Sequence, residues 1–297
     1  MRVNPNLAPD ILSGIWRTEA QEQSALLEMS TGKRVNTPSD DPLASAEMVR
    51  NQDETTRTDQ YLQNIDTLTT QVQNADTALS SVVQVLNQAI TLGLQGATGT
   101  VSTSQMQQIA LSVQGIQTQV LQSANTSVSG FYLFGGTAST TAPYELDPTS
   151  ASGVKYNGND STNMVSIADG MNVQVNVPGD QLFQNSGGNV FGSLQQLITA
   201  LQAGDKTATA TATTQLQSAL ASLSGQREFY GSTLNQLTST QTFLQQEKVS
   251  LASQQNSLVG ADMATAATSL TQAQTAYNAV LAAAAKILPT SLLDYLK

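Results

Sequence analysis

Apolar residues recur at alternating steps of four and three along residues 61–89, which is the spacing of a coiled-coil seam. Pro42 suits the first position of a helix and Asp41 suits its N-cap. The pattern therefore predicts a helix over about residues 42–94, which the glycines at 93, 96 and 99 are expected to end. The seam consists of Tyr61, Ile65, Leu68, Val72, Ala75, Leu79, Val82, Leu86 and Ala89.

A second group of helical patterns fills the last third of the chain. Apolar residues repeat every seven positions from Leu223 to Leu258, and another seam follows from Met263 to Ile287. Seams so far apart in sequence pack most simply as antiparallel pairs, which brings the chain ends together. Residues 6–29 and the last helix each lack an obvious partner except the other. The seven-residue series consists of Leu223, Tyr230, Leu237, Leu244, Leu251 and Leu258.

The middle of the chain has the period of two that is typical of β-strands. Residues 164–167 and 172–177 alternate apolar and polar side chains on either side of Asp169-Gly170, a dipeptide that favours a hairpin turn. Shorter strand patterns lie at residues 131–134 and 154–156. The predicted fold is mostly α, a long antiparallel helical coiled-coil bundle with a small β-rich inserted domain.

The composition narrows the possible chemistry. The 297 residues include no Cys and no His, which excludes a Ser-His-Asp triad, a thiol nucleophile, a disulfide and the usual zinc sites. The net charge of −10 argues against nucleic-acid binding, which needs clustered Lys and Arg. Only 11% of residues are charged, and none lies between Asp76 and Glu145. A long uncharged polar surface favours dense packing in an assembly.

Three motifs could carry chemistry, and each has a simpler structural interpretation. Residues 30–34 contain a Gly-Lys pair but lack the glycine run of a phosphate loop, and Arg34 stands where Ser or Thr would hold magnesium. Asp40-Asp41 is interpreted as a helix cap rather than a catalytic pair. Residues 157–163 are rich in oxygen ligands but lack the order of a calcium loop, so we interpret them as a polar turn. We expect no catalytic residue, metal or cofactor.

The N-terminal twelve residues lack the apolar core of a cleaved signal peptide. No stretch approaches the ~20 apolar residues of a membrane span, so we expect no membrane insertion. These features indicate a cytoplasmic protein unless a dedicated export system recognises the chain.

Two motifs are similar to those of a known family. Met29–Pro42 (MSTGKRVNTPSDDP) resembles the N-terminal segment of bacterial flagellins and hook-associated proteins. Its Asp-Asp-Pro ending is similar to hook-associated proteins of the hook–filament junction, whereas flagellins usually continue Asp-Asp-Ala. Gly130–Gly136 (GFYLFGG) resembles the G-[RK]-Y-[LI]-F-[AS]-G motif of the junction proteins, with Phe131 in place of the basic residue.

Three further segments resemble the same proteins, in the same order along the chain. They are Asp169-Gly170 with Val175–Asp180 and Phe183, Arg227 with Gly231, and Leu288–Leu296. On these matches the chain is identified as a member of the flagellin family, with a flagellin-like bundle.

The resemblance implies a structural protein of the bacterial flagellum rather than an enzyme. It implies secretion of the unfolded chain by the flagellar type III apparatus, with an uncleaved signal and an export chaperone on the C-terminal helix. It also implies a homo-oligomeric ring at the hook–filament junction, between hook-associated protein 1 on the hook side and flagellin on the filament side.

We expect three parts that follow this role. Residues 1–38 and 256–297 form a terminal helical domain that orders on assembly, 39–130 and 191–255 form a helical rod, and 131–190 form an outer β-rich insertion. The expected subunit-interface residues are Leu7, Ile11, Ile15, Leu26, Leu270, Tyr277, Val280, Ile287 and Leu292. The expected connector and helix-cap residues are Gly32, Lys33, Arg34, Asp40, Asp41 and Pro42.

Two other functions stay open on the sequence. A short flagellin would form the filament itself and would polymerise from seeds. A carboxylate-based hydrolase in the β-rich insertion would act on peptides or glycans.

Overall fold

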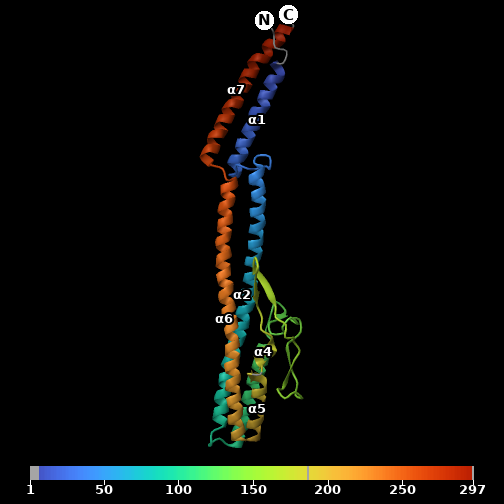
Figure 1. The fold of residues 1–297 in the computed structure, drawn as a ribbon, viewed down its shortest axis with the longest axis vertical. Helices are drawn as coiled ribbons and strands as arrows, with labels where there is room; N and C mark the ends of the chain where they lie inside the picture. The colour runs from blue at the N-terminus through green and yellow to red at the C-terminus, as the bar shows by residue number, and fades with distance from the viewer. Residues whose placement is uncertain (1–6, 186, 296–297) are drawn as a thin grey trace. The chain divides into compact units, whose positions relative to one another are not determined.

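The computed structural model describes residues 7–185 and 187–295, with backbone alone at residues 7, 8 and 287–295 (Figure 1). The chain forms two compact units, one of residues 1–57 with 246–297 and one of residues 58–245. The predicted mostly helical fold with a small β-rich insertion is confirmed. Seven helices are described: α1 Leu7–Thr31, α2 Pro42–Gly96, α3 Thr103–Ala124, α4 Gly179–Phe183, α5 Val190–Ala203, α6 Lys206–Val259 and α7 Met263–Tyr295.

Helices α2 and α6 run antiparallel, as the two seams predict (Figure 1). In the unit of residues 58–245, the side chain of Gln241 donates to Asp66 and that of Arg227 to Asp76. In the unit of residues 1–57 and 246–297, Asn51 donates to the Leu251 carbonyl at 3.0 Å. The heptad residues from Ile65 to Ala89 and from Leu223 to Leu244 are buried, so the seams form the core of the larger unit.

Gly93 does not end α2, and this corrects the sequence interpretation. The helix continues to Gly96, and both glycines face other helices. A Cβ built on Gly93 would meet Thr213 Oγ1 of α6, and one on Gly96 would lie 2.5 Å from Leu201 Cδ2 of α5. These glycines therefore permit close approach of helices.

Helices α3 and α5 pack beside α2 and α6 at this end of the larger unit. Ser102 precedes α3 and forms a capping box with Gln105, in which the Ser102 hydroxyl accepts from the Gln105 amide. Asn189 caps the start of α5, and Gly204, with a φ of +69°, is the C-cap that follows its last residue. Asp205 then accepts from the Ala208 amide at 2.9 Å and caps α6.

Four antiparallel hairpins make up the β-rich region, and each forms its own two-stranded sheet. The predicted hairpin at Asp169-Gly170 is present, with Val165 opposite Val173, although its second strand ends at Gln174 rather than Val177. The pairs are β1 Ser127–Val128 with β2 Phe131–Tyr132, β3 Tyr144–Leu146 with β4 Val154–Tyr156, β5 Met164–Ala168 with β6 Met171–Gln174, and β7 Gln184–Asn185 with β8 Gly188–Asn189.

Aromatic side chains join these hairpins to the helices. The Tyr144 ring lies 5.7 Å from that of Phe183 in an edge-on arrangement and 5.0 Å from that of Phe191 on α5. Phe134 packs edge-on against Phe183 at 5.8 Å. Because a sheet of two strands is marginal alone, this cluster supplies burial that stabilises the β3–β4 hairpin against α4 and α5.

One helix, α2, contains an 18-residue stretch whose mean hydropathy of 1.2 would suit a membrane span by length and composition. A helix buried in a protein core can have the same length and composition, and the apolar seam of α2 is buried against α6.

Candidate functional site

The segment between α1 and α2, residues 32–41, is the connector that the sequence singles out. Gly32 follows α1 with a φ of +66°, and its amide donates to the Glu28 carbonyl at 2.9 Å. This left-handed conformation suits glycine and turns the chain out of the helix. A side chain at Gly32 would meet nothing within 4 Å, so its requirement is conformational rather than steric.

The connector pairs with the segment between α6 and α7. Lys33 forms an isolated antiparallel bridge with Gly260. The Arg34 amide donates to the Val259 carbonyl at 2.7 Å, and the Ala261 amide donates to the Gly32 carbonyl at 2.9 Å. These bonds tie the N-terminal and C-terminal connectors to each other.

Arg34 links this pairing to the start of α2. Its Nη2 donates to the Leu258 carbonyl at 3.0 Å and to Asp41 Oδ2 at 3.2 Å. Asp41 Oδ1 in turn accepts from the Ala44 amide at 3.0 Å, the geometry of an N-cap directly before Pro42. The Asp41 carboxylate therefore both caps α2 and binds Arg34.

Asp40 organises the loop itself. Its Oδ2 accepts from the amides of Asn36 and Thr37 at 3.0 and 2.8 Å, and its Oδ1 accepts from the Thr37 hydroxyl at 2.9 Å. The Asp40-Asp41 pair is thus engaged in turn and cap hydrogen bonds. Asp262 caps α7 as Asp41 caps α2, because its carboxylate accepts from the Ala264 amide at 3.0 Å.

These hydrogen bonds lower the pKa of all three carboxyl groups. The Thr37 amide is the main cause of the lowered pKa of Asp40. The pKa of Asp41 is lowered by the Ala44 amide and then by Arg34. The Ala264 amide is the main cause of the lowered pKa of Asp262. Donors stabilise the charged form of each carboxylate, so the connector is most firmly held at neutral pH.

A small apolar cluster also joins the connector to the starts and ends of the neighbouring helices. Val35, Ala44 and Val259 are buried there, and Met48 and Leu258 pack against them. The Arg34 bonds to Leu258 and Asp41 lie beside this cluster, so polar and apolar contacts hold the same two segments together.

The terminal helices α1 and α7 lie side by side and antiparallel (Figure 1). A Cβ on Gly14 would lie 4.0 Å from Val280, and Ala25, Ala266, Ala273 and Ala284 are buried. Small residues therefore let the two helices approach closely. Of the expected interface residues, Ile11, Ile15, Leu270, Tyr277 and Val280 are half-buried in this unit and Leu26 is exposed. The side chains of Leu7, Ile287 and Leu292 lie outside the described residues.

Another face of α1 carries four exposed apolar side chains, of which only Leu26 is among the expected interface residues. Leu12 is 47% exposed, Trp16 66%, Leu26 55% and Leu27 44%. With 3.6 residues per turn, these positions fall on one side of the helix, about a quarter turn or more from Gly14 and Ala25. The spacing of Leu12 and Trp16, together with the only Trp in the chain, was the available signal.

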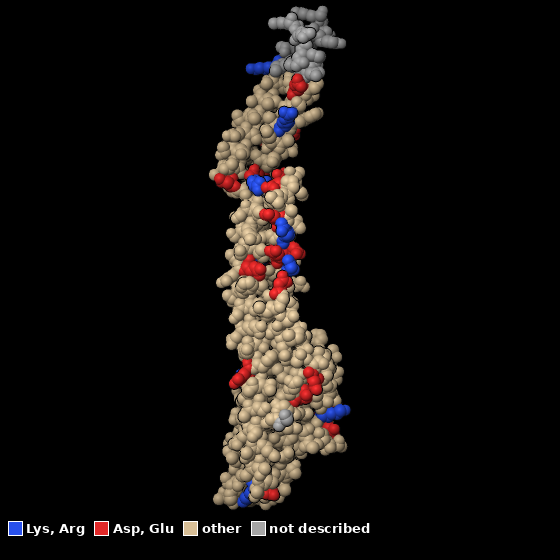
Figure 2. Space-filling view, viewed as in Figure 1, with Lys and Arg blue, Asp and Glu red and all other residues tan. Residues whose placement is uncertain are grey.

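Charge is unevenly distributed between the parts of the chain. On the face in Figure 2, charged side chains gather over α1, the connectors and the first turns of α2. The surface of the helices in residues 58–245 is largely uncharged in the same view. That unit carries only thirteen of the 34 charged residues.

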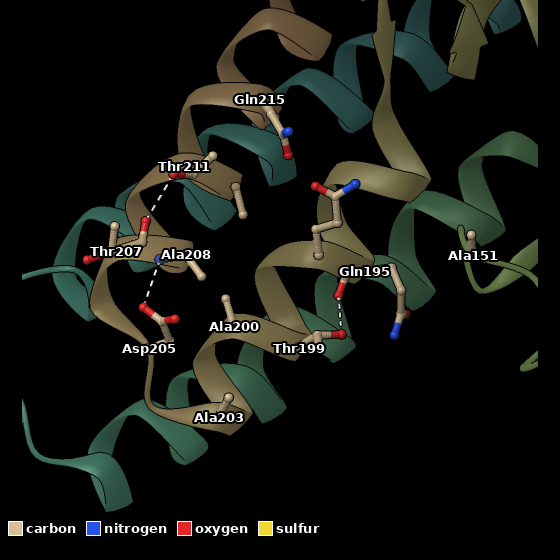
Figure 3. Close-up of a pocket in the computed structure, with 12 residues that line it drawn as sticks. Ala151, Gln195, Thr199, Ala200, Ala203, Asp205, Thr207, Ala208, Thr211 and Gln215 are labelled. Atoms are coloured by element: carbon tan, nitrogen blue, oxygen red, sulfur yellow. Dashed lines mark hydrogen bonds between the residues drawn. The ribbon is translucent and has the colours of Figure 1, made fainter.

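A groove of about 620 Å³ lies between α5 and the start of α6 (Figure 3). Its walls are alanines with Thr and Gln side chains, and Asp205 at one end is engaged with the Ala208 amide. The hydroxyls of Thr199 and Thr211 bond to carbonyls of their own helices. The groove is therefore lined mainly by small residues, and the hydroxyls of Thr199 and Thr211 are engaged within their own helices.

Comparison with known proteins identifies two family regions. Residues 5–139 match the N-terminal helical region of bacterial flagellin, and residues 213–296 match its C-terminal helical region. The two regions lie on either side of most of the β-rich insertion.

Individual relatives agree with this assignment. The chain is 27% identical over 292 residues to flagellar hook-associated protein 3 of Escherichia coli, covering 90% of each chain. It is 32% identical over 135 residues to flagellar hook-associated protein 3 of Salmonella typhimurium, covering 45% of this chain and 43% of the relative. The fold is similar to that of the flagellar junction protein of Legionella pneumophila, with a TM-score of 0.61 over 72% of this chain and all of the other, at 16% identity.

Proposed function

Because this chain belongs to the flagellin family as a hook-associated structural component of the flagellum, we propose that its copies form a junction ring. In this proposal hook-associated protein 1 lies on the hook side of the ring and flagellin on the filament side. The proposed role is structural. One side of the ring along the flagellar axis matches hook-associated protein 1, and the opposite side matches flagellin.

The exposed apolar face of α1 carries the proposal. Its residues Leu12, Trp16, Leu26 and Leu27 remain in solvent although α1 already packs against α7. Exposed apolar side chains that include a tryptophan are typical of a protein–protein interface. We infer that this face, together with the expected residues of α7, contacts neighbouring subunits.

The division of the chain fits such a role. We propose that residues 1–38 and 256–297 order fully on assembly, with 39–130 and 191–255 as the rod and 131–190 facing outward. The paired connectors would set the direction in which the terminal helices leave the rod. Export through the type III apparatus, with a chaperone on the C-terminal helix, would deliver the chain to the hook tip.

Deletion of the gene tests the function. We expect cells with hooks but without filaments, and flagellin lost to the medium, because flagellin then lacks its attachment ring. Complementation with the intact gene is the control. Normal filaments on the deletion strain would contradict the proposal.

Substitution of the apolar face tests its role. Trp16→Ser removes the largest exposed apolar side chain of this face and should weaken subunit association by about 2 kcal/mol or more, roughly thirtyfold. Leu111→Ser on α3 is the matched control, because Leu111 is also 66% exposed. We expect Trp16→Ser to be exported and folded but to support few filaments. Equal filament numbers in both strains would argue against this face.

Two measurements on the purified protein separate the alternatives. Seeding should give monomers or short rings, whereas long filaments would indicate a flagellin. Limited proteolysis of the monomer should trim both ends to a fragment near residues 40–255, and protection of both ends would contradict ordering on assembly.

A further inference from the structure

A groove of about 590 Å³ runs along α2 and α6 in the unit of residues 1–57 and 246–297. Its walls carry carboxylate, amide and hydroxyl groups, and they include a single apolar residue among those described. The groove therefore suits a polar or charged group rather than an apolar one. The lining consists of Glu47, Arg50, Asn51 and Glu54 on α2 and Ser250, Ser253, Gln254, Ser257 and Leu258 on α6.

Asn51 is a buried polar residue of this lining, and it is only 4% exposed. Its Nδ2 donates to the Leu251 carbonyl at 3.0 Å and to Gln254 Oε1 at 3.3 Å. These two acceptors fix the orientation of the amide, because the reverse orientation would set Oδ1 against the Leu251 carbonyl. In the described part of the chain Asn51 Oδ1 has no hydrogen-bond partner. A buried acceptor without a donor is costly, so this place calls for a donor from outside the chain.

Two carboxylates lie on the same face of α2 as Asn51. Glu47 precedes it by four residues and Glu54 follows it by three, and both line the groove. Arg50 is the only basic residue in the described lining, and no hydrogen bond or ion pair joins it to either glutamate among the described residues. The groove thus has an excess of negative charge beside an unpaired acceptor. A basic side chain would supply both the opposite charge and the missing donor.

Lys248 lies on the opposite edge of the same helix pair. With about 3.6 residues per turn, Lys248 and Ala252 fall on one side of the buried Leu251, whereas Ser250 and Gln254 fall on the other. Lys248 is exposed, and it is two residues from Ser250, so it lies at the level of the groove. A closed ring forms when one surface of each copy meets a different surface of the next copy. In such a ring the Lys248 edge of one copy can meet the groove of its neighbour at the same level.

We propose that Lys248 of a second copy enters this groove and donates to Asn51 Oδ1, Glu47 and Glu54. This contact rests on the proposed junction ring, and it assigns the two lateral surfaces that meet there. An ammonium group has three donors, which matches one amide oxygen and two carboxylates. Gln254 is exposed and bonds to Asn51 only at 3.3 Å, so its side chain shifts to admit the ammonium group. A surface contact of Lys248 within its own copy is weak and does not prevent the exchange.

Cysteine cross-linking in assembled flagella is the direct test, because the chain contains no Cys of its own. Arg50→Cys places a thiol in the groove, and Ala252→Cys places one beside Lys248. We expect a chain with both changes to be joined into dimers and larger oligomers by a short bismaleimide. The matched control combines Gln52→Cys with Ala252→Cys. Gln52 is also exposed but lies on the Lys248 edge, so this chain should give few links between copies.

Charge reversal tests the chemistry of the contact. Lys248→Glu brings a third carboxylate to the groove and should weaken the association of copies at least about fivefold. Adding Glu54→Lys to the same chain exchanges the two charges and should restore most of the loss. The amount of protein on isolated flagella and the number of filaments per cell measure both effects. An unchanged Tm of each purified variant separates the contact from a folding defect.

Either of two results would overturn the contact. One is normal filaments in which the control pair cross-links the copies as well as the test pair does, or in which neither pair does. The other is a double variant, Lys248→Glu with Glu54→Lys, that assembles no better than Lys248→Glu alone. Both results can occur while the wild-type chain still supports filaments, so they leave the junction ring standing. Normal filaments on the deletion strain would instead contradict the ring itself.

Discussion

Arg227 and Asp76 form a two-pronged ion pair that joins α6 to α2. Nε lies 2.5 Å from Oδ1, and Nη2 lies 3.0 Å from Oδ2. The side chains are 36% and 29% exposed, so water screens the pair only in part. Asp76 is also the last charged residue before the uncharged stretch that ends at Glu145. In a helical pair held mainly by apolar seams, this contact contributes a directional, register-specific bond.

Replacing Arg227 by lysine should destabilise the protein even though the charge is kept. A lysine cannot make two parallel bonds to one carboxylate, and we expect a loss of about 1 kcal/mol in the free energy of unfolding. Urea denaturation measures it. A double-mutant cycle with Asp76→Asn is the control, since the loss should largely vanish when the carboxylate is already absent.

Gly93→Ala should also destabilise the protein, against the usual effect of such a change in a helix. The new methyl would meet Thr213 Oγ1, which bonds to the Thr209 carbonyl at 2.7 Å, and overpacking of this kind costs about 1–3 kcal/mol. Gly115→Ala on α3 is the matched control because no atom lies within 4 Å. That change should stabilise by about 0.5–1 kcal/mol. Stabilisation by both changes would contradict the close approach of α2 and α6.

Two buried tyrosines should respond differently to loss of their hydroxyls. The Tyr230 hydroxyl accepts from the Val177 amide at 3.2 Å, so Tyr230→Phe leaves a buried donor unpaired and should cost about 1–3 kcal/mol. The Tyr144 hydroxyl has no hydrogen-bond partner, so Tyr144→Phe should cost little. Thermal unfolding of the two variants compares them, and equal losses would show that the Tyr144 hydroxyl has a partner.

Acid should loosen the connectors. The pKa of Asp40, Asp41 and Asp262 is lower in the folded chain than the ordinary value of 3.8, so each contributes stability that is present above that value. This stability is lost as pH falls through the lowered folded values. We therefore expect faster hydrogen exchange of the Asn36, Thr37 and Ala44 amides, after correction for intrinsic rates, only below about pH 4.

Asp40→Asn and Asp41→Asn provide the control for that experiment. An asparagine oxygen still accepts a hydrogen bond but does not titrate, so each variant should lose the acid dependence at its own amides. Exchange that stays acid-sensitive at Asn36 and Thr37 in Asp40→Asn would show that another group controls the loop.

Local patterns in the sequence predicted most of the fold. The seven-residue series from Leu223 to Leu251 is buried, Asp41 precedes the first turn of α2, and Asp169-Gly170 forms a hairpin. Such features depend on residues within one or two turns of each other, and the physics of helix caps, tight turns and apolar faces acts over that range.

Only the tertiary structure decided which surfaces meet. The pattern of α1 shows apolar residues around much of the helix, but packing against α7 separates Ile15, which is half-buried, from Trp16, which is exposed. Likewise, a glycine at position 93 is typical of a helix end. Thr213 of α6, 120 residues away, makes it a position of close helix packing instead. The sequence by itself thus determined the elements and their apolar sides, whereas partner choice arises from non-local packing that no local window contains.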